Sequence, residues 1–253
     1  MSHLFCRFAY ICLVIATIST RVCASDDRAI VIESGDRKAS LIELFTSQGC
    51  SSCPPAEKWL NKFSSRRELW IDYVPVAFHV DYWNGLGWKD PFSSKENSAR
   101  QRRHQEENHL SRAYTPCFLV DGREWKGWFS LNRKLPRVQG PGHPLSAKIL
   151  DTQVDAWSSG ATTEPLVLHI ALLGFDIESQ IKAGENVNRT LHHNFTALAW
   201  DSHISTNGRW SAALPVPKGP RVARYGVALW INRPEDLSPL QAIGGWLPGY
   251  NPK

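Results

Sequence analysis

Two cysteines separated by two residues, Cys50 and Cys53, are the side chains of this chain whose spacing most clearly permits chemistry. They lie between an apolar, strand-like run at 41–45 and a helix-like run at 55–63. A Cys-x-x-Cys pair at such a junction can interconvert between a dithiol and a disulfide. The free N–H groups and positive dipole end of a helix N-terminus would stabilise a thiolate there. The spacing therefore predicts a thiol–disulfide redox site.

Roles can be assigned within the pair. Cys50 is expected to be the attacking thiol, because it is the N-terminal and more exposed member, and Cys53 the thiol that resolves the mixed disulfide. A static structural disulfide is the alternative. The same spacing occurs in zinc ribbons, but these need a second cysteine pair, which the chain does not have.

Residues 1–24 have the pattern of a secretory signal peptide. Arg7 precedes an apolar stretch at 8–18, and Ala24 ends a small-residue cleavage site. The stretch is too short to predict a membrane span, although retention as an anchor is the alternative. We therefore expect a periplasmic or secreted protein in an oxidising compartment, with no stable membrane span after cleavage.

Cleavage would leave three of the six cysteines, Cys50, Cys53 and Cys117. This count fits one redox pair and one extra thiol better than a disulfide scaffold. The formal net charge of +5 is mild for 253 residues and gives no reason to expect nucleic acid as a partner. No organic cofactor is expected, because the cysteines themselves would carry the electrons.

The elements that must position this pair fall into two parts. Residues 37–160 are predicted to form an α/β domain, and residues 161–253 a smaller, mostly β, sandwich-like domain. The first part is predicted to contain strands at 41–46, 70–79 and 117–120, helices at 55–67, 95–110 and 145–157, and a hairpin around Asp121-Gly122. The helix at 145–157 would close the first domain.

A second feature strengthens the redox interpretation. Thr115-Pro116 directly precedes the strand that begins at Cys117. In thioredoxin-like folds a cis-proline at this place lies against the redox disulfide, and X–Pro bonds adopt the cis form at modest cost. We therefore predict a cis Pro116 close to Cys50 and Cys53, with an ordinary trans proline as the alternative.

Several longer motifs resemble one family. They are LIELFTSQGCSSCPPA at 41–56, FHVDYWN at 78–84, ARQ at 99–101, YTP at 114–116, VDG at 120–122 and AGEN at 183–186. Together they are similar to domain of unknown function 1223, a secreted, thioredoxin-like family. The resemblance implies a thioredoxin-like fold and a periplasmic or secreted setting, but no known substrate. The chain departs from the family in having Cys117 where glutamine is common, and in an expanded segment at 131–144.

Other residues are candidates for the site. Glu43, on the strand before the motif, could take the proton of the resolving thiol if burial raises its pKa, and a solvent-facing glutamate is the alternative. His79 could stabilise a thiolate, Asp81 could orient His79, and Trp83 could line the cleft beside the cysteine pair. A strand-end hydrogen-bond cluster is the alternative for these three.

Cys117 and Thr115, beside the expected cis-proline, complete the predicted substrate-contacting set with His79, Asp81 and Trp83. Cys117 could trap a mixed disulfide, pair with a partner or join a metal site, or it could be a buried apolar thiol.

Two further groups of side chains receive simpler interpretations. The basic run of Arg100, Arg102, Arg103 and His104 is interpreted as a solvated helix face. His192 and His193 are expected to point to opposite faces of a strand, so that no metal site pairs them.

The predicted function is thiol–disulfide exchange on protein thiols, which requires protein substrates and a partner that recycles the pair. A copper-binding protein or chaperone is one alternative, with Cys50, Cys53, Cys117 and His79 as ligands, because soft thiolates bind Cu(I). A non-catalytic binding module on a thioredoxin-like scaffold is another.

Overall fold

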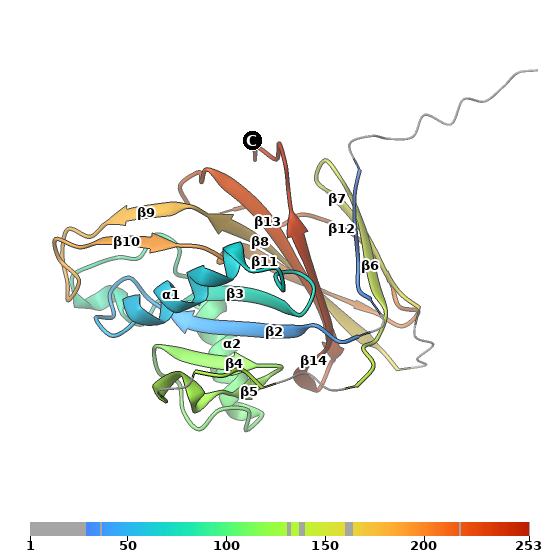
Figure 1. The fold of residues 1–253 in the computed structure, drawn as a ribbon, viewed down its shortest axis with the longest axis horizontal. Helices are drawn as coiled ribbons and strands as arrows, with labels where there is room; N and C mark the ends of the chain where they lie inside the picture. Colours follow the sequence, from blue (N-terminus) through green and yellow to red (C-terminus); the bar gives the residue numbers. More distant parts are fainter. Residues whose placement is uncertain are drawn as a thin grey trace, which may run out of the picture.

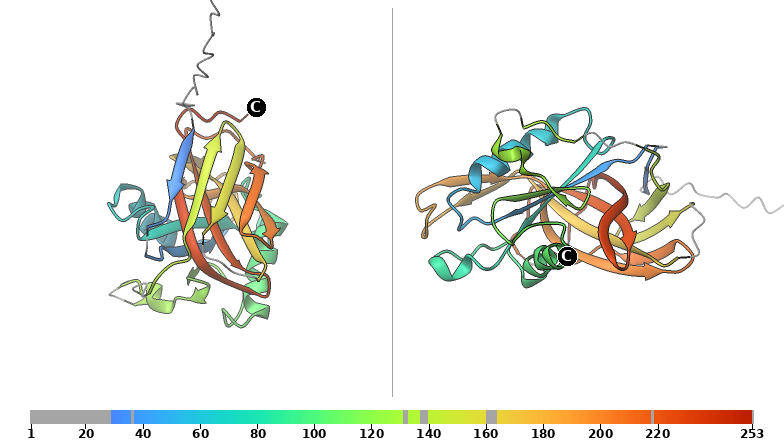
Figure 2. Two further views of the ribbon diagram at one scale, coloured as in Figure 1. Left: turned by 90° about the vertical axis from the view of Figure 1, so that its right-hand side faces the viewer. Right: turned by 90° about the horizontal axis from the view of Figure 1, so that it is seen from below.

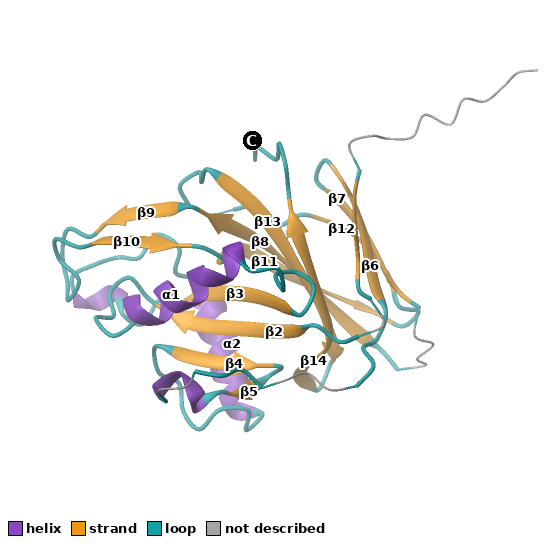
Figure 3. Cartoon of the chain, viewed as in Figure 1, coloured by secondary structure: helices purple, strands orange, loops and turns teal. Residues whose placement is uncertain are grey.

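The computed structural model describes residues 29–35, 37–130, 133–136, 140–159, 164–217 and 219–252 (Figure 1). Over these ranges the chain forms fourteen strands and two α-helices, as the colouring in Figure 3 shows. The predicted signal peptide at 1–24 and the predicted domain boundary at 160–161 lie outside the described residues. None of the helices in the described ranges has the length and apolar character needed to cross a membrane.

An eight-stranded sheet forms the centre of the molecule. Its strands, from one edge to the other, are β14 (Asp236–Trp246), β13 (Arg224–Arg233), β8 (Leu166–Phe175), β11 (Thr196–Ser205), β3 (Tyr73–His79), β2 (Ser40–Thr46), β4 (Cys117–Val120) and β5 (Arg123–Glu124). The pairs β2–β3 and β3–β11 are parallel and the other pairs are antiparallel.

Two smaller sheets flank this one. A four-stranded antiparallel sheet consists of β1 (Ile30–Glu33), β6 (Leu145–Leu150), β7 (Gln153–Ser158) and β12 (Arg209–Ala213). It packs against β14 and β11 at one end of the molecule, where the views of Figure 2 also place it. A two-stranded ribbon of β9 (Ile177–Gln180) and β10 (Thr190–His193) reaches back to α1 (Pro54–Asn61).

The two helices cover opposite faces of β2 and β3 (Figure 1). Thr46 of β2 bonds to Glu57 of α1, whereas Glu43, three positions earlier on the strand, pairs with Arg100 of α2 (Lys95–Glu106). Residues an odd number of positions apart in a strand point to opposite faces. The strand end that precedes Cys50 is therefore enclosed by a helix on each side.

The packing on these two faces explains the burial of β2, whose polar residues Ser40, Glu43 and Thr46 are buried together with its apolar ones. All seven residues of β2 are buried, as expected for a strand covered on both faces. On the α1 face Trp59 packs edge-on against Phe118 of β4, and on the α2 face Phe45 stacks on Phe78 of β3. These contacts hold β2, β3 and β4 rigidly below the cysteine pair.

The predicted fold class, an α/β thioredoxin-like domain followed by a smaller β sandwich, is wrong. The molecule is mostly β, because strands β8, β11, β13 and β14 extend the sheet that contains β2 instead of forming a separate sandwich. Strands from both sides of the predicted boundary share this sheet, and the principal hydrophobic core contains residues from both parts.

The predicted helix at 145–157 is also wrong, because this segment is the β6–β7 hairpin. Leu145, Ala147 and Ile149 alternate with more exposed residues, which is the period of a strand. The turn is made at Asp151, whose φ of 52° is left-handed. The hairpin predicted at Asp121-Gly122 is confirmed, with φ values of 52° and 77°.

Candidate functional site

Cys50 and Cys53 are joined by a disulfide at the start of α1. Cys53 is the residue that precedes the helix, and Pro54 and Pro55 occupy its first positions, where a missing N–H leaves no bond unmade. Both cysteines are fully buried, so the prediction that Cys50 is the more exposed of the two is wrong. The two serines between them are exposed, and the disulfide therefore lies just beneath a Ser51-Ser52 surface turn.

The loop that carries the disulfide is held by residues from the connection between β9 and β10. The Asn186 side chain is fully buried, and its Nδ2 donates to the carbonyl oxygens of Gln48 and Cys50, at 2.9 Å in each case. Glu185 accepts a hydrogen bond from the Ser51 N–H at 3.0 Å. The AGEN motif at 183–186 thus positions the disulfide loop, a role that the sequence interpretation did not assign to it.

The Thr115–Pro116 bond is cis, as predicted. Trp83 connects this bond to the disulfide loop, because its Nε1 donates to Thr115 Oγ1 at 2.8 Å. A Cβ placed on Gly49, next to Cys50, would lie 3.1 Å from Trp83 Cβ. The structure therefore brings Trp83, Thr115 and Pro116 together beside the disulfide loop.

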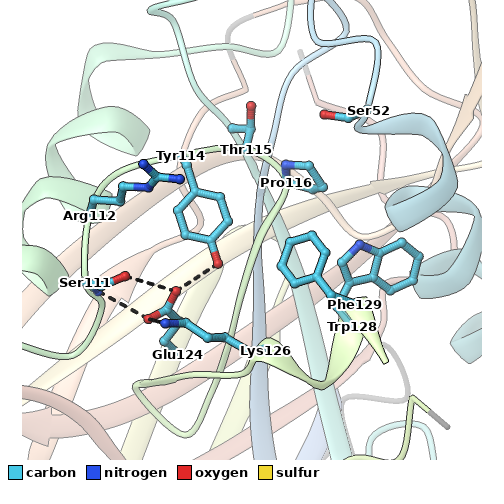
Figure 4. Close-up of a pocket in the computed structure, with 10 residues that line it drawn as sticks. All are labelled: Ser52, Ser111, Arg112, Tyr114, Thr115, Pro116, Glu124, Lys126, Trp128 and Phe129. Carbon is cyan, nitrogen blue, oxygen red and sulfur yellow. Dashed lines mark hydrogen bonds and ion pairs between the residues drawn. The ribbon is translucent and has the colours of Figure 1, made fainter. Parts of the chain in front are cut away.

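A surface hollow of about 450 Å³ opens beside Pro116 (Figure 4). Its wall contains Ser52 of the disulfide loop and three aromatic side chains, Tyr114, Trp128 and Phe129. Figure 4 also shows Glu124 accepting hydrogen bonds from Tyr114 and from Ser111, with Arg112 and Lys126 on the same side. The hollow thus combines apolar surface with charges of both signs next to the Cys-x-x-Cys turn.

Glu43 does not lie on the face of the disulfide helix. It is completely buried on the α2 face, where its Oε1 accepts from Arg100 Nε at 2.6 Å and its Oε2 lies 3.3 Å from His104 Nε2. Burial alone would raise the pKa of Glu43, but the charges of Arg100 and His104 lower it to about 2. Glu43 is therefore a structural anion rather than the raised-pKa proton acceptor proposed from the sequence.

The same contacts correct the interpretation of the basic run. Arg100 and His104 are buried partners of Glu43, and only Arg102 and Arg103 form the solvated face. The spacing of four residues between Arg100 and His104, which places both on one side of a helix, was the signal that could have shown this.

His79 belongs to a buried cluster on the α1 face. Its Nδ1 lies 2.7 Å from Asp90 Oδ2, so Asp90 orients it rather than Asp81, which bonds to Ser98 at 2.5 Å. Burial would lower the pKa of His79, but Asp90 raises it overall. Nothing in the sequence pattern indicated Asp90, because it follows a turn 11 residues beyond His79.

The cluster continues through Glu57 of α1. Burial would raise the pKa of Glu57, but the charges of His193 and His79 and the hydrogen bonds from His193 and Thr46 together lower it. His193 Nδ1 pairs with Glu57 Oε2, and Thr46 donates to Glu57 Oε1 at 2.6 Å. His192 is exposed and His193 is buried, as the strand alternation predicts. Glu57 is four residues after Cys53, and it is a buried carboxylate on the α1 side of the sheet, as is Asp90.

Cys117 is a free, buried thiol. It pairs with Phe45 across β2 and β4, so its side chain points to the α2 face, whereas His79 pairs with Thr46 and points to the α1 face. Burial is the main cause that raises the pKa of Cys117 to about 12. The structure therefore does not bring together the four ligands of the copper alternative, Cys50, Cys53, Cys117 and His79.

Residues 41–232 match the model of the family described as Protein of unknown function (DUF1223). The match spans most of the chain, so the chain belongs to this family, as the sequence motifs indicated. None of the curated proteins matches the chain.

Two solved structures are similar to this chain. The crystal structure of protein AGR_C_4864 from Agrobacterium tumefaciens has a TM-score of 0.63 at 25% identity, covering 87% of this chain and 99% of that one. HBP35 of Porphyromonas gingivalis has a TM-score of 0.53 at 15% identity, covering 87% of this chain and 78% of that one. The second likeness concerns the fold alone.

Proposed function

We propose that this member of the DUF1223 family is a thiol–disulfide oxidoreductase that acts on protein thiols through Cys50 and Cys53. The observation that carries the proposal is the disulfide at the start of α1, with Ser52 of its turn in the wall of the aromatic-lined hollow beside Pro116. A substrate segment bound in this hollow would lie beside the Ser51-Ser52 turn that covers the disulfide.

The proposed reaction exchanges one disulfide for another. A substrate thiolate attacks Cys50, the Cys50–Cys53 bond breaks, and Cys53 leaves as a thiolate at the N-terminus of α1. The second substrate thiolate then attacks the mixed disulfide and releases Cys50. Two electrons pass from the substrate dithiol to the pair, and the reverse sequence reduces a substrate disulfide.

Access to sulfur is part of this proposal. Because Cys50 and Cys53 are both fully buried, an incoming thiol reaches them only when the Ser51-Ser52 turn moves outward. The exposed contact between the Ser51 N–H and Glu185 is the bond that such a movement breaks first.

The hollow suggests the kind of substrate. Tyr114, Trp128 and Phe129 offer apolar area, and Arg112 and Lys126 offer donors for backbone carbonyls or acidic side chains. This combination fits an extended polypeptide segment next to a cysteine. We further propose a periplasmic or secreted setting, supported by the signal-like pattern of residues 1–24, and a separate protein that recycles the pair.

Trapping the mixed disulfide tests the proposal. In a Cys53→Ser variant the mixed disulfide at Cys50 cannot be resolved, so incubation with an oxidised peptide substrate should give a stable adduct at Cys50 that mass spectrometry detects. Cys117→Ala in the same background is the matched control and should react equally. The absence of an adduct at Cys50 in both variants, when their circular dichroism matches that of the parent, would reject exchange. It would favour a static structural disulfide.

A further inference from the structure

Three buried side chains from three separate elements converge behind the disulfide helix. Glu57 comes from α1, His79 from the end of β3 and His193 from β10. One oxygen or nitrogen atom of each lies within 4.8 Å of the corresponding atoms of the other two. Their side chains are at most 6% exposed, so the three groups form one enclosed polar cluster.

The imidazole of His79 is oriented so that one nitrogen faces into this cluster without a partner. Its Nδ1 is bound to Asp90 Oδ2, which as a carboxylate accepts the Nδ1 proton. Its Nε2 is fully buried and has no hydrogen-bond partner. Because buried polar atoms nearly always have a partner, this free nitrogen indicates that a ligand belongs in the cluster.

His193 has a partner at each of its ring nitrogens. Its Nδ1 faces Glu57, while its Nε2 lies 3.1 Å from the side-chain amide of Gln48. The Gln48 nitrogen can only donate, because Gln48 Oε1 accepts from Trp88, so His193 accepts at Nε2 and carries its proton at Nδ1, towards Glu57. A metal ion bound at His193 Nδ1 therefore requires the Gln48 amide to turn, so that the ring proton moves to Nε2. A carboxylate that accepts the other ring N–H, as Asp90 does for His79, fixes the ring orientation of histidines that bind metals.

We propose that Glu57, His79 and His193 bind a divalent transition-metal ion, with Zn²⁺ as the best match. Two histidines and one glutamate are a recognised ligand set for Zn²⁺. Tetrahedral zinc with bonds of about 2.0–2.1 Å holds its ligand atoms about 3.4 Å apart, so small side-chain movements complete the geometry. A solvent molecule would supply the fourth ligand.

The charge and position of the cluster agree with such an ion. The carboxylates of Glu57 and Asp90 bring two negative charges, which a divalent cation balances. Bound there, the ion would join α1, β3 and β10, whose three ligands are far apart in the sequence. The proposed site uses no cysteine, so it is independent of the proposed redox function and of the thiolate copper set.

Zinc binding to the disulfide form tests this site without interference from thiolates. The protein in which Cys6, Cys12, Cys23 and Cys117 are replaced by alanine is oxidised at Cys50–Cys53, treated with a chelator and incubated with Zn²⁺ alone. Bound metal is measured by mass spectrometry after gel filtration. We expect about one zinc ion per chain and a higher thermal unfolding midpoint. Zinc far below one ion per chain, with no change in the thermal unfolding midpoint, would overturn the proposal.

Matched variants identify the ligands. His193→Gln should abolish stoichiometric binding, whereas His192→Gln, its exposed neighbour on β10, should bind as the parent does. Asp90→Asn removes the carboxylate that orients His79 and also accepts from the Gln48 and Phe92 N–H groups, and it should weaken binding about 10- to 100-fold. Equal zinc binding by His193→Gln and by the parent would overturn the assignment.

Cobalt provides a readout that does not depend on whether a variant folds well. Co²⁺ bound to the parent protein by two imidazoles and a carboxylate should give the visible absorption of a four-coordinate site. The spectrum of free aqueous Co²⁺ in the presence of the folded protein would contradict the proposed site.

Discussion

Replacing Arg100 by methionine is expected to destabilise the protein strongly, because it leaves the Glu43 carboxylate buried without its main partner. The side chains of Glu43 and Arg100 are 0% and 1% exposed, and 2.6 Å separates Glu43 Oε1 from Arg100 Nε. Methionine keeps much of the arginine volume while removing the charge. The change therefore tests the ion pair itself rather than the packing of α2.

The magnitude follows from the pKa of Glu43, which Arg100 and His104 lower from 4.5 to about 2 against the effect of burial. This difference corresponds to about 3 kcal/mol of stability at neutral pH, since one pKa unit is worth about 1.4 kcal/mol. Breaking a buried ion pair by removing one partner typically costs about 3–5 kcal/mol. We therefore expect Arg100→Met to lower the free energy of unfolding by about 3–5 kcal/mol at pH 7.

The sign of the pH dependence also follows. The pKa of Glu43 is lower in the folded than in the unfolded protein, so its contribution is fully present above about pH 4.5 and is lost as the pH falls towards 2. At pH 3 the parent has lost about 2 kcal/mol of this contribution. The variant has no such contribution to lose, and the difference in stability between parent and variant should shrink as the pH falls.

Urea unfolding followed by tryptophan fluorescence, at pH 7 and at pH 3, measures both effects. Arg102→Met on the exposed face of the same helix is the matched control and should change stability by less than about 0.5 kcal/mol. The reasoning would be refuted if Arg100→Met cost no more than Arg102→Met at pH 7. A stability difference that stayed constant between the two pH values would refute it equally.

Three further predictions concern the thiol of Cys117 and two side chains that contact the disulfide loop. Because burial raises the pKa of Cys117 to about 12, its thiol should resist iodoacetamide at pH 8 in the folded protein and react on unfolding; rapid labelling of folded protein would contradict this. Asn186→Ala leaves two buried carbonyl oxygens of the disulfide loop unpaired. It should lower the free energy of unfolding by denaturant by about 2–4 kcal/mol and speed reduction of the disulfide by dithiothreitol. Lys182→Ala, at an exposed position of the same connection, should have neither effect. Trp83→Phe should lower the free energy of unfolding by about 1 kcal/mol, because the hydrogen bond to Thr115 is lost. If Trp83→Phe lowers it equally in the parent and in the Thr115→Val background, the bond contributes nothing.

The sequence was most informative where short-range signals determine the structure. The apolar run of β2, the proline pair after Cys53 and the Asp121-Gly122 turn each specify their own element, and the structure contains all three. It was misleading at 145–157, where Ile149, Leu150, Val154 and Trp157 fit a helical period. The alternation of Leu145, Ala147 and Ile149, followed by the turn at Asp151, was the better guide.

The arrangement of the strands could not be read from local patterns. The pairing of β11 with β3 joins segments that are more than a hundred residues apart. Through β11, strands β8, β13 and β14 are added to the same sheet. Such pairings depend on complementary faces in three dimensions, whereas each strand on its own fits either a separate sandwich or an extended sheet.

The same limit applies to the site. The Cys-x-x-Cys pair and Pro116 were identifiable because each motif is contiguous. Asn186, which holds the disulfide loop, and His193, which pairs with Glu57, come from the other half of the chain. The direction of Glu43 stayed open, because it depends on which helix covers each side of β2.

The redox equilibrium of the pair tests the central claim most directly. The protein is equilibrated with glutathione and dithiothreitol buffers of increasing reducing strength, its thiols are trapped, and the state of Cys50, Cys53 and Cys117 is read by mass spectrometry. The account predicts a reversible two-electron transition of Cys50 and Cys53 with a midpoint above about −300 mV, while Cys117 stays reduced throughout. A Cys50–Cys53 bond that remains oxidised below about −300 mV would identify a structural disulfide and contradict the account.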